Sequence, residues 1–403
     1  NQLNFFDDLK LRVSAGQTGG QGVSAYATRS RFVVSNYGMG GSLQSGMAES
    51  RWGGPAAALL KWETTNQFDI GLDIAFLNNR VNLTVDAYYK KTKDLLLDKL
   101  IPMSSGFSRI QANYGNVTNK GLEISGHFIP VKARNFLWSI DANISFNRNK
   151  VGGLDADQYS DVAWGIENMF LVRNGEPIGT LYGYVEDGFY DNEAEVRADP
   201  LYRNETDSKV KSMVGEVKYK NLDDDPVIDN RDRQIIGNTN PDYQYGITNT
   251  LEWKNWTFSF FLQGTQGNDV LNVNLKKFDM ASVDNMPYFI YNNRWTAENR
   301  ANAKWPRANR TSTRSMKASD RYIEDGSYLR CKNVSLSYRF RHPMKFVESI
   351  NLVASVSNLF TISGYSWMDP DVNSFGSDPK RRGVDMASYP SARTFNFGVQ
   401  IGF

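Results

Sequence analysis

One segment of the chain has the residue types and the spacing of a cation-binding loop. In the run YKNLDDDPVIDNRDR, residues 219–233, oxygen-bearing side chains recur at alternate positions. An EF-hand loop holds a hard divalent cation through its positions 1, 3, 5, 7, 9 and 12, with a backbone carbonyl at position 7. Counted from Asn221, these positions are Asn221, Asp223, Asp225, Val227, Asp229 and Asp232. The spacing therefore makes calcium the candidate cofactor of this segment.

Two residues in this segment depart from the EF-hand pattern. Pro226 stands at position 6, where the sharp turn normally requires glycine, and proline cannot adopt a positive φ. Asp232 at position 12 is one methylene shorter than the glutamate that normally binds the cation through both oxygens. The alternative is an acidic surface loop that is held together by its own Asx turns. The sequence leaves both interpretations open.

No group of residues has the spacing of a catalytic site. The chain has one cysteine, Cys331, and two histidines, His127 and His342. No nucleophile stands at a recognisable spacing from a base, and a single cysteine excludes an internal disulfide or a cysteine-based metal cluster. The formal net charge of +2 argues against nucleic acid as a partner. The sequence thus predicts a protein that is not an enzyme.

Aromatic residues gather in three segments, 151–190, 278–305 and 363–391. An exposed ring can stack on a sugar or anchor a partner protein, and the alternative is that the rings pack these segments against one another. Arginines between 294 and 314 would suit acidic sugars or peptide carboxylates. The candidate contacts for a ligand or partner are Trp164, Tyr182, Tyr184, Phe189, Tyr190, Phe278, Tyr288, Tyr291, Trp295, Trp305, Tyr365, Trp367, Asp369 and Asn373.

Alternating polarity indicates the elements that carry these segments. In the last ten residues, TFNFGVQIGF, the odd-numbered positions from Phe395 to Phe403 are apolar, and the even-numbered ones are polar or glycine. Because a strand turns alternate side chains to opposite faces, this segment predicts a strand with one apolar and one polar face. The pattern returns in about ten segments of about ten residues each, which is the length of a transmembrane strand.

The connections between these segments alternate in length. Short ones are expected at 77–80, about 130–135, about 254–255 and about 341–348, and long ones at about 19–58, 98–114, 151–241, 268–327 and 363–393. A barrel gives this alternation when turns lie at one rim and loops at the other. The sequence therefore predicts an all-β, transmembrane antiparallel β-barrel.

The predicted barrel fixes which faces meet lipid. Its apolar faces would contact membrane lipid and its polar faces the lumen, and the parity of His127 and Cys331 predicts that both face the lumen. No apolar run is long enough for a transmembrane helix. The alternative is a large soluble β-protein whose apolar faces pack inside.

Several stretches together resemble the SusC/RagA-type TonB-dependent transporters of the Bacteroidetes outer membrane. The string SGYSWMDPD at 363–371 departs from the pattern that is usual in that family. The matching stretches are NVTNKGLEISG (116–126), GNTNPDYQYGITNTLEWKNWTFSFFLQGTQGNDV (237–270), IEDGSYLRCKNVSLSYRF (323–340), SNLFTISGYSWMDPDVN (357–373) and YPSARTFNFGVQIGF (389–403).

The resemblance implies a barrel of about 22 strands with a plugged lumen, of which residues 1–403 would form the C-terminal strands. We expect the plug domain, the TonB box and the N-terminal half of the barrel outside this chain, as its partners. The resemblance further implies a SusD-like surface lipoprotein as a lid and TonB as the source of energy. The implied function is import of a bulky nutrient across the outer membrane, with an oligosaccharide favoured over an oligopeptide. A passive porin and a soluble glycan-binding protein are the rival functions.

Overall fold

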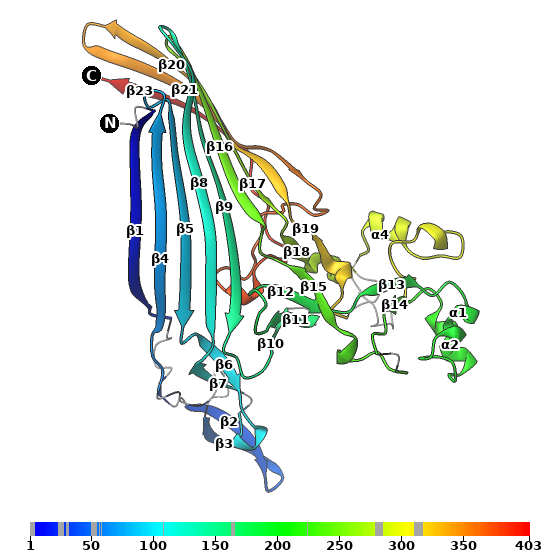
Figure 1. Ribbon diagram of the computed structural model, residues 1–403. Helices are drawn as coiled ribbons and strands as arrows, with labels where there is room; N and C mark the ends of the chain where they lie inside the picture. Colours follow the sequence, from blue (N-terminus) through cyan, green and yellow to red (C-terminus); the bar gives the residue numbers. More distant parts are fainter. Residues whose placement is uncertain are drawn as a thin grey trace.

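The computed structural model describes residues 5–22, 28–29, 32–49, 55, 57, 59–107, 109–162, 166–223, 225–278, 285–309 and 317–403. An antiparallel sheet of ten strands, each paired with the strands beside it in chain order, forms the largest part of it (Figure 1). Its strands are β1 (Phe6–Gly20), β4 (Glu63–Phe76), β5 (Val81–Lys93), β8 (Asn116–Ala133), β9 (Phe136–Gly152), β16 (Tyr243–Trp253), β17 (Trp256–Gln266), β20 (Tyr328–Met344), β21 (Val347–Ser363) and β23 (Thr394–Gly402).

The register of the sheet aligns the apolar positions of neighbouring strands. Leu72, Val85, Ile124 and Ile144 lie side by side in one row across β4, β5, β8 and β9. Such rows make one face of the sheet continuously apolar. Large side chains on this face stay open to the surroundings: Phe397 of β23 is 84% exposed. An uncovered apolar face of this extent fits contact with lipid.

The opposite face carries polar and charged side chains. The guanidinium of Arg12 on β1 donates hydrogen bonds to Asp73 on β4 at 2.8 Å and to Asp86 on β5 at 3.1 Å. On β8 and β9, His127 Nδ1 lies 2.7 Å from Asp141 Oδ1. Charged groups that are paired but still half exposed are typical of a water-lined barrel interior.

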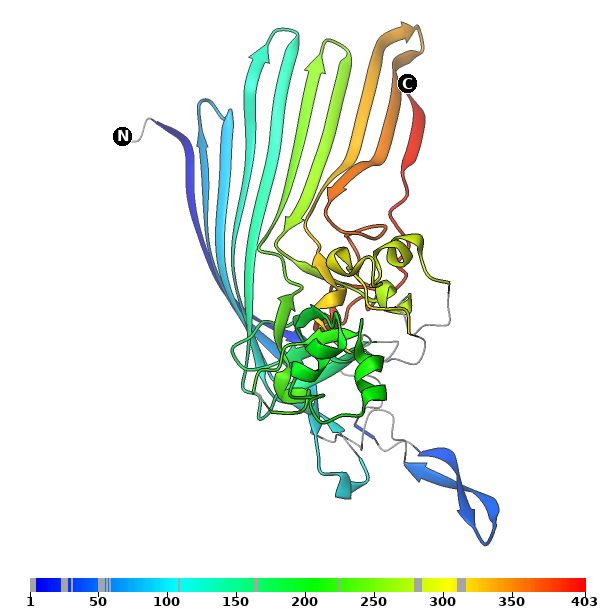
Figure 2. The ribbon, with the colours of Figure 1, turned by 90° about the vertical axis from the view of Figure 1, so that its right-hand side faces the viewer.

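The connections differ in length at the two ends of the sheet (Figure 2). Two-residue turns join β8 to β9, β16 to β17 and β20 to β21, and residues 77–80 join β4 to β5. The turn at residues 77–80 uses left-handed backbone at Leu77, Asn78 and Asn79, a conformation that asparagine tolerates better than most residues. Connections of 21–62, 94–115, 153–242, 267–327 and 364–393 emerge at the other end.

The long connections contain their own secondary structure. The strands there are β2 (Phe32–Met39), β3 (Ser42–Glu49), β6 (Leu96–Leu100), β7 (Arg109–Asn113), β10 (Gln158–Val162), β11 (Ile166–Val172), β12 (Thr180–Gly183), β13 (Glu186–Phe189), β14 (Val217–Tyr219), β15 (Gln234–Asn238), β18 (Asp269–Asn272), β19 (Ile323–Asp325) and β22 (Val384–Asp385). The helices are α1 (Glu193–Ala198), α2 (Asp207–Met213), α3 (Val273–Lys277) and α4 (Tyr288–Asn293), with short 3₁₀ turns that include η2 (Asn230–Asp232) and η6 (Pro379–Arg381). None of the helices in the described ranges is long and apolar enough to cross a bilayer.

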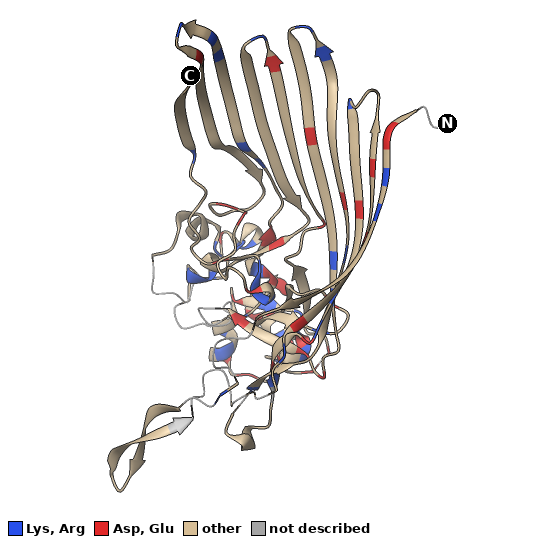
Figure 3. Ribbon diagram, turned by 90° about the vertical axis from the view of Figure 1, so that its left-hand side faces the viewer, with Lys and Arg blue, Asp and Glu red and all other residues tan. Residues whose placement is uncertain are grey.

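Three of the long connections fold into one body, which we call the loop lobe: the described parts of 153–242, 267–327 and 364–393. They share a hydrophobic core in which Val162, Leu271 and Val384 are each at most 4% exposed. Figure 3 shows that charged residues gather in this lobe and are sparse along most of the sheet. The main buried core of the described chain therefore lies in the lobe. We call the ten-stranded sheet the wall.

The loop lobe is attached to the polar face of the wall. The backbone N–H of Ile178 donates to Asn149 Oδ1 of β9 at 2.8 Å, and Asn149 has the same parity as the polar Asn147 and Ser145. Arg330 of β20, which pairs with Gln263 on the polar face of β17, reaches the 364–393 connection. Because the lobe is attached to the polar face at the long-connection end of the sheet, this face is the inner one of the barrel.

One face assignment from the sequence is wrong. A β-bulge at Lys332 shifts the register, so that Asn333 pairs with Phe261 while Cys331 pairs with Leu262. The shift turns Cys331 to the apolar side, where it is 3% exposed, instead of the lumen side that its parity predicted. The same shift turns Arg330 to the lumen side.

Candidate functional site

Most of the aromatic residues singled out in the sequence lie inside the loop lobe. The six with exposed fractions of 9% or less are Tyr182, Tyr184, Tyr190, Trp295, Trp305 and Tyr365. Tyr182 and Tyr184, for example, both lie against the guanidinium of Arg233, at 4.8 Å and 5.5 Å from ring centre to Cζ. These six rings follow the alternative that the sequence left open, packing of the segments against one another, and they are not exposed contacts because each is covered by the lobe itself. Phe189 is half-buried, with Arg321 Cζ 5.5 Å above its ring. Trp164 lies outside the described residues.

Two of the candidate rings from the sequence remain open on the short helix α4. Tyr288 is 78% exposed and Tyr291 is 52% exposed. Arg294 stacks on the Tyr291 ring at 3.8 Å, which holds that ring in place. Exposed, amphipathic rings of this kind suit a protein contact. Asn373, also exposed, donates to the carbonyl of Gly376 at 2.6 Å and so shapes its own loop.

A second pair of predicted rings lines an apolar cavity of about 710 Å³. Phe278 follows α3, and Trp367 lies in the 364–393 connection; their ring centres are 5.9 Å apart. Met368 and Tyr389 also line the cavity and are 66% and 92% exposed. The volume is in the range of small-ligand sites, and the flat apolar walls could hold a sugar face or an apolar side chain.

This cavity depends on how the 364–393 connection is held to the wall. The Arg330 side chain, 1% exposed, forms an ion pair with Asp369, which is 6% exposed. Arg330 also donates to the hydroxyls of Thr361 and Ser391, each at 3.0 Å. Asp369 accepts the backbone N–H of Ser391 at 2.9 Å and of Asp371 at 3.0 Å. Asp369 was a candidate ligand contact; its position makes it an anchor of the loop.

The environment of Asp369 favours its charged form. Burial by itself would raise the pKa of this carboxyl group. The backbone N–H groups of Ser391 and Asp371 and the Arg330 guanidinium outweigh the burial and hold the pKa of Asp369 below its usual range. In the same connection, burial and a 2.7 Å hydrogen bond to Asp385 raise the pKa of Tyr365, which therefore stays a neutral donor.

The acidic loop at 221–232 is closed on an arginine. The Arg231 guanidinium forms ion pairs with Asp223, Asp225 and Asp229. Both carboxylate oxygens of Asp232 accept backbone N–H groups, from Leu222 and Asp229, at 2.8 Å each. Asx turns join the loop from Asn221 to Val227.

This arrangement does not fit a bound cation as it stands, because a guanidinium occupies the centre of the carboxylates. Within the described part of the chain, no group of three or more His, Cys, Asp or Glu side chains is placed to hold a metal ion. Calcium binding at this loop therefore stays a prediction, and it requires Arg231 to move.

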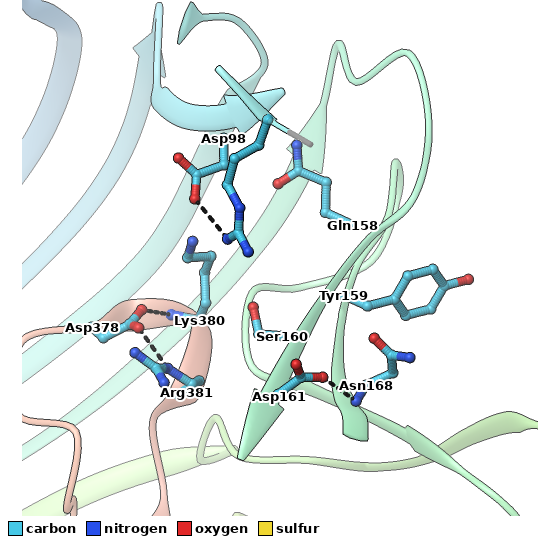
Figure 4. Close-up of a pocket in the computed structure, with 10 residues that line it drawn as sticks. Asp98, Gln158, Tyr159, Ser160, Asp161, Asn168, Asp378, Lys380 and Arg381 are labelled. Atoms are coloured by element: carbon cyan, nitrogen blue, oxygen red, sulfur yellow. Dashed lines mark hydrogen bonds and ion pairs between the residues drawn. The ribbon is translucent and has the colours of Figure 1, made fainter. Parts of the chain in front are cut away.

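A polar cavity of about 440 Å³ was not anticipated from the sequence. It lies between β6, β7, the β10–β11 pair and η6, where Asp98, Gln158 and Lys380 extend toward one space (Figure 4). Its residues come from three separate long connections. None of them belongs to a motif, which is why the sequence did not single them out.

The wall and the lobe together define a class of protein. It is a transmembrane β-barrel that carries, on its lumen side, a folded lobe with cavities of the size of a small ligand. The chain itself belongs to the family described as TonB dependent receptor-like, beta-barrel, whose sequence profile matches residues 2–359. The predicted fold class is thereby confirmed.

Three similar proteins are each longer than this chain. It is 34% identical to the TonB-dependent receptor P26 of Formosa agariphila, over 99% of this chain and 40% of that protein. It is 29% identical to the TonB-dependent receptor SusC of Bacteroides thetaiotaomicron, over 100% of this chain and 38% of that protein. The RagAB peptide transporter structure aligns with a TM-score of 0.76 at 20% identity, over 99% of this chain and 41% of that chain, which shows the shared fold. The resemblance to SusC/RagA-type transporters is confirmed, and the chain spans about two fifths of the length of these relatives.

Proposed function

We propose that this chain is the C-terminal part of an outer-membrane transporter that imports an oligosaccharide with energy delivered through TonB. The remaining barrel strands, the plug and the TonB box belong to the rest of that transporter. The strand order supports this view, because β1 and β23 end the sheet without a further partner among the described strands. Open sheet edges are not tolerated in lipid, so other strands must complete the wall.

The observation that carries the proposal is the aromatic cavity of Phe278 and Trp367, built from loops on the lumen side of the wall. A cargo held by flat rings and scattered polar groups binds through many modest contacts. Modest contacts suit transport, since the cargo must leave the site again when the plug moves.

A SusD-like surface lipoprotein is the proposed lid over this site. The support is the exposed pair Tyr288 and Tyr291 on α4, at the surface of the loop lobe (Figure 1). Aromatic anchors of this type commonly carry the binding energy of protein interfaces. We expect the double variant Tyr288→Ala and Tyr291→Ala to reduce co-purification of the lipoprotein without loss of assembled barrel.

Uptake of labelled oligosaccharides by cells tests the proposed function. Wild-type uptake should stop when TonB is deleted, and Trp367→Ala should lower it by about fivefold or more, as loss of a stacking ring costs about 1 kcal/mol. Trp253→Ala is the matched control, because Trp253 is 54% exposed at the short-turn end of the wall. Uptake that persists without TonB would indicate a passive porin, and uptake of oligopeptides alone would replace the proposed cargo.

A further inference from the structure

The polar cavity brings together parts of the chain that are far apart in sequence. Asp98 and Arg109 come from the β6–β7 pair, Gln158 and Asp161 from β10, and Lys380 from η6. Its volume of about 440 Å³ is enough for a sugar unit, and its lining is polar. The aromatic cavity, by contrast, is lined mainly by apolar side chains.

The carboxylates of this cavity already have donors from the protein. Asp98 accepts from Arg109 at 3.3 Å. Asp161 accepts the backbone N–H of Asn168 at 2.7 Å. Asp378 accepts the backbone N–H of Lys380 at 3.0 Å and Arg381 Nε at 2.8 Å. These carboxylates therefore need few hydrogen-bond donors from a ligand.

Among the donors of the cavity, Gln158 Nε2 and the Lys380 ammonium matter most, and neither has an acceptor within the described part of the chain. Gln158 Nε2 is buried without a hydrogen-bond partner. The Lys380 ammonium makes no ion pair with any residue in the described ranges, although Arg109 and Arg381 on either side are paired. Figure 4 shows the Lys380 side chain extending toward Asp98, with the Gln158 side chain across the same cavity. A buried donor without a partner costs about 1–3 kcal/mol, so a matching acceptor on a ligand would be bound favourably.

We infer that this cavity is a subsite for an oxyanion, a carboxylate or sulfate ester, on an acidic oligosaccharide cargo. The inference rests on the proposed function and specifies its substrate class. The anion lies against the Lys380 ammonium, and the Gln158 amide, which lines the same cavity, turns its buried Nε2 toward the anion and donates to it. The Asp98–Arg109 pair is long and half exposed, and such pairs contribute little, so Arg109 can turn toward the anion at small cost.

Binding to the intact transporter complex in detergent tests the subsite. The probes are oligogalacturonate for the carboxylate, carrageenan oligosaccharide for the sulfate ester, neutral galacto-oligosaccharide and a neutral oligopeptide. Lys380→Gln and Gln158→Leu should each weaken binding of at least one acidic probe by about tenfold or more, as expected for loss of a hydrogen bond to a charged group. Neutral saccharide should change by less than about twofold, and added salt should weaken only the acidic probe.

Lys209→Gln is the matched control: it removes the same charge from an exposed position on α2. The subsite would be overturned if Lys380→Gln weakened binding of acidic and neutral saccharides equally. It would also be overturned if Lys380→Gln and Lys209→Gln had the same small effect. Either result would leave the proposal of oligosaccharide import intact. Neutral saccharide binding without any acidic saccharide binding would have the same consequence. Binding of the oligopeptide and of no saccharide would instead overturn the proposed function together with the subsite.

Discussion

The buried pair Arg330 and Asp369 holds the 364–393 connection to the wall, and Arg330→Met tests its strength. The change leaves the Asp369 carboxylate 6% exposed and without its cation. Breaking a buried ion pair from one side costs about 3–5 kcal/mol. Asp369 keeps two backbone N–H donors, at 2.9 Å and 3.0 Å, which places the expected cost at about 3 kcal/mol, the lower end of that range.

Hydrogen exchange of the intact transporter in detergent measures this cost locally. About 3 kcal/mol corresponds to about a hundredfold faster exchange of amides in 364–393, if they exchange through opening of this connection. In the double variant Arg330→Met and Asp369→Leu, amides in 364–393 should exchange more slowly than the summed free-energy costs of the two single changes predict. The reason is that neither charge is then left without its partner.

Arg381→Gln is the control for this measurement. It removes an ion pair with Asp378 in the same connection, but the side chains there are 33% and 22% exposed, so the expected cost is about 0–1 kcal/mol. If Arg330→Met and Arg381→Gln had equal effects, the assignment of Arg330 as the anchor of this loop would be refuted.

Three further predictions concern the wall and the loops. Phe397→Arg on the lipid side should destabilise the assembled barrel by about 2–4 kcal/mol near the middle of the membrane, and Asn396→Ala should cost little, both measured by urea unfolding in lipid vesicles. Because the pKa of Asp369 is held below its unfolded value of about 3.9, its contribution to stability is complete above about pH 4 and is lost as the pH falls further. Pepsin should therefore cut the 364–393 connection faster as the pH falls from about 4 toward about 2, and a pH-independent rate relative to a reference peptide would contradict this. If the 221–232 loop binds calcium, calorimetry with Arg231→Ala should show tighter calcium binding than the wild type. No heat from either protein at millimolar calcium would rule out calcium binding by this loop.

The wall could be predicted from the sequence because its signal is local. Alternation from Phe68 to Phe76 is visible in consecutive residues, and the strand register follows from keeping one face apolar. The prediction went wrong at Cys331, where a single extra residue in the strand reverses the parity. Nothing in the composition of that segment marks the bulge.

The loop lobe could not be predicted in the same way. Its core joins Val162 to Val384, and contacts over such a separation leave no periodic pattern. The sequence left open whether the aromatic residues of the long connections contact a ligand or pack against one another, and it could not show which six of the candidate rings pack inside the lobe. Arg330 and Lys380 were missed for a related reason: a charged residue gains its role from partners in other connections.

The function inferred for the loop lobe depends on which face of the sheet meets lipid, and nitroxide labels on β20 can distinguish the two faces. Two variants, Leu336→Cys and Ser337→Cys, are each made in a Cys331→Ala background. The introduced cysteine is then labelled in the intact transporter in lipid vesicles. Leu336 is on the apolar face with Phe258, and Ser337 is on the polar face with Thr257. We expect the label at Leu336 to be relaxed mainly by oxygen dissolved in lipid and the label at Ser337 by a water-soluble nickel chelate. The reverse result, or equal access of the nickel chelate to both labels, would contradict the account.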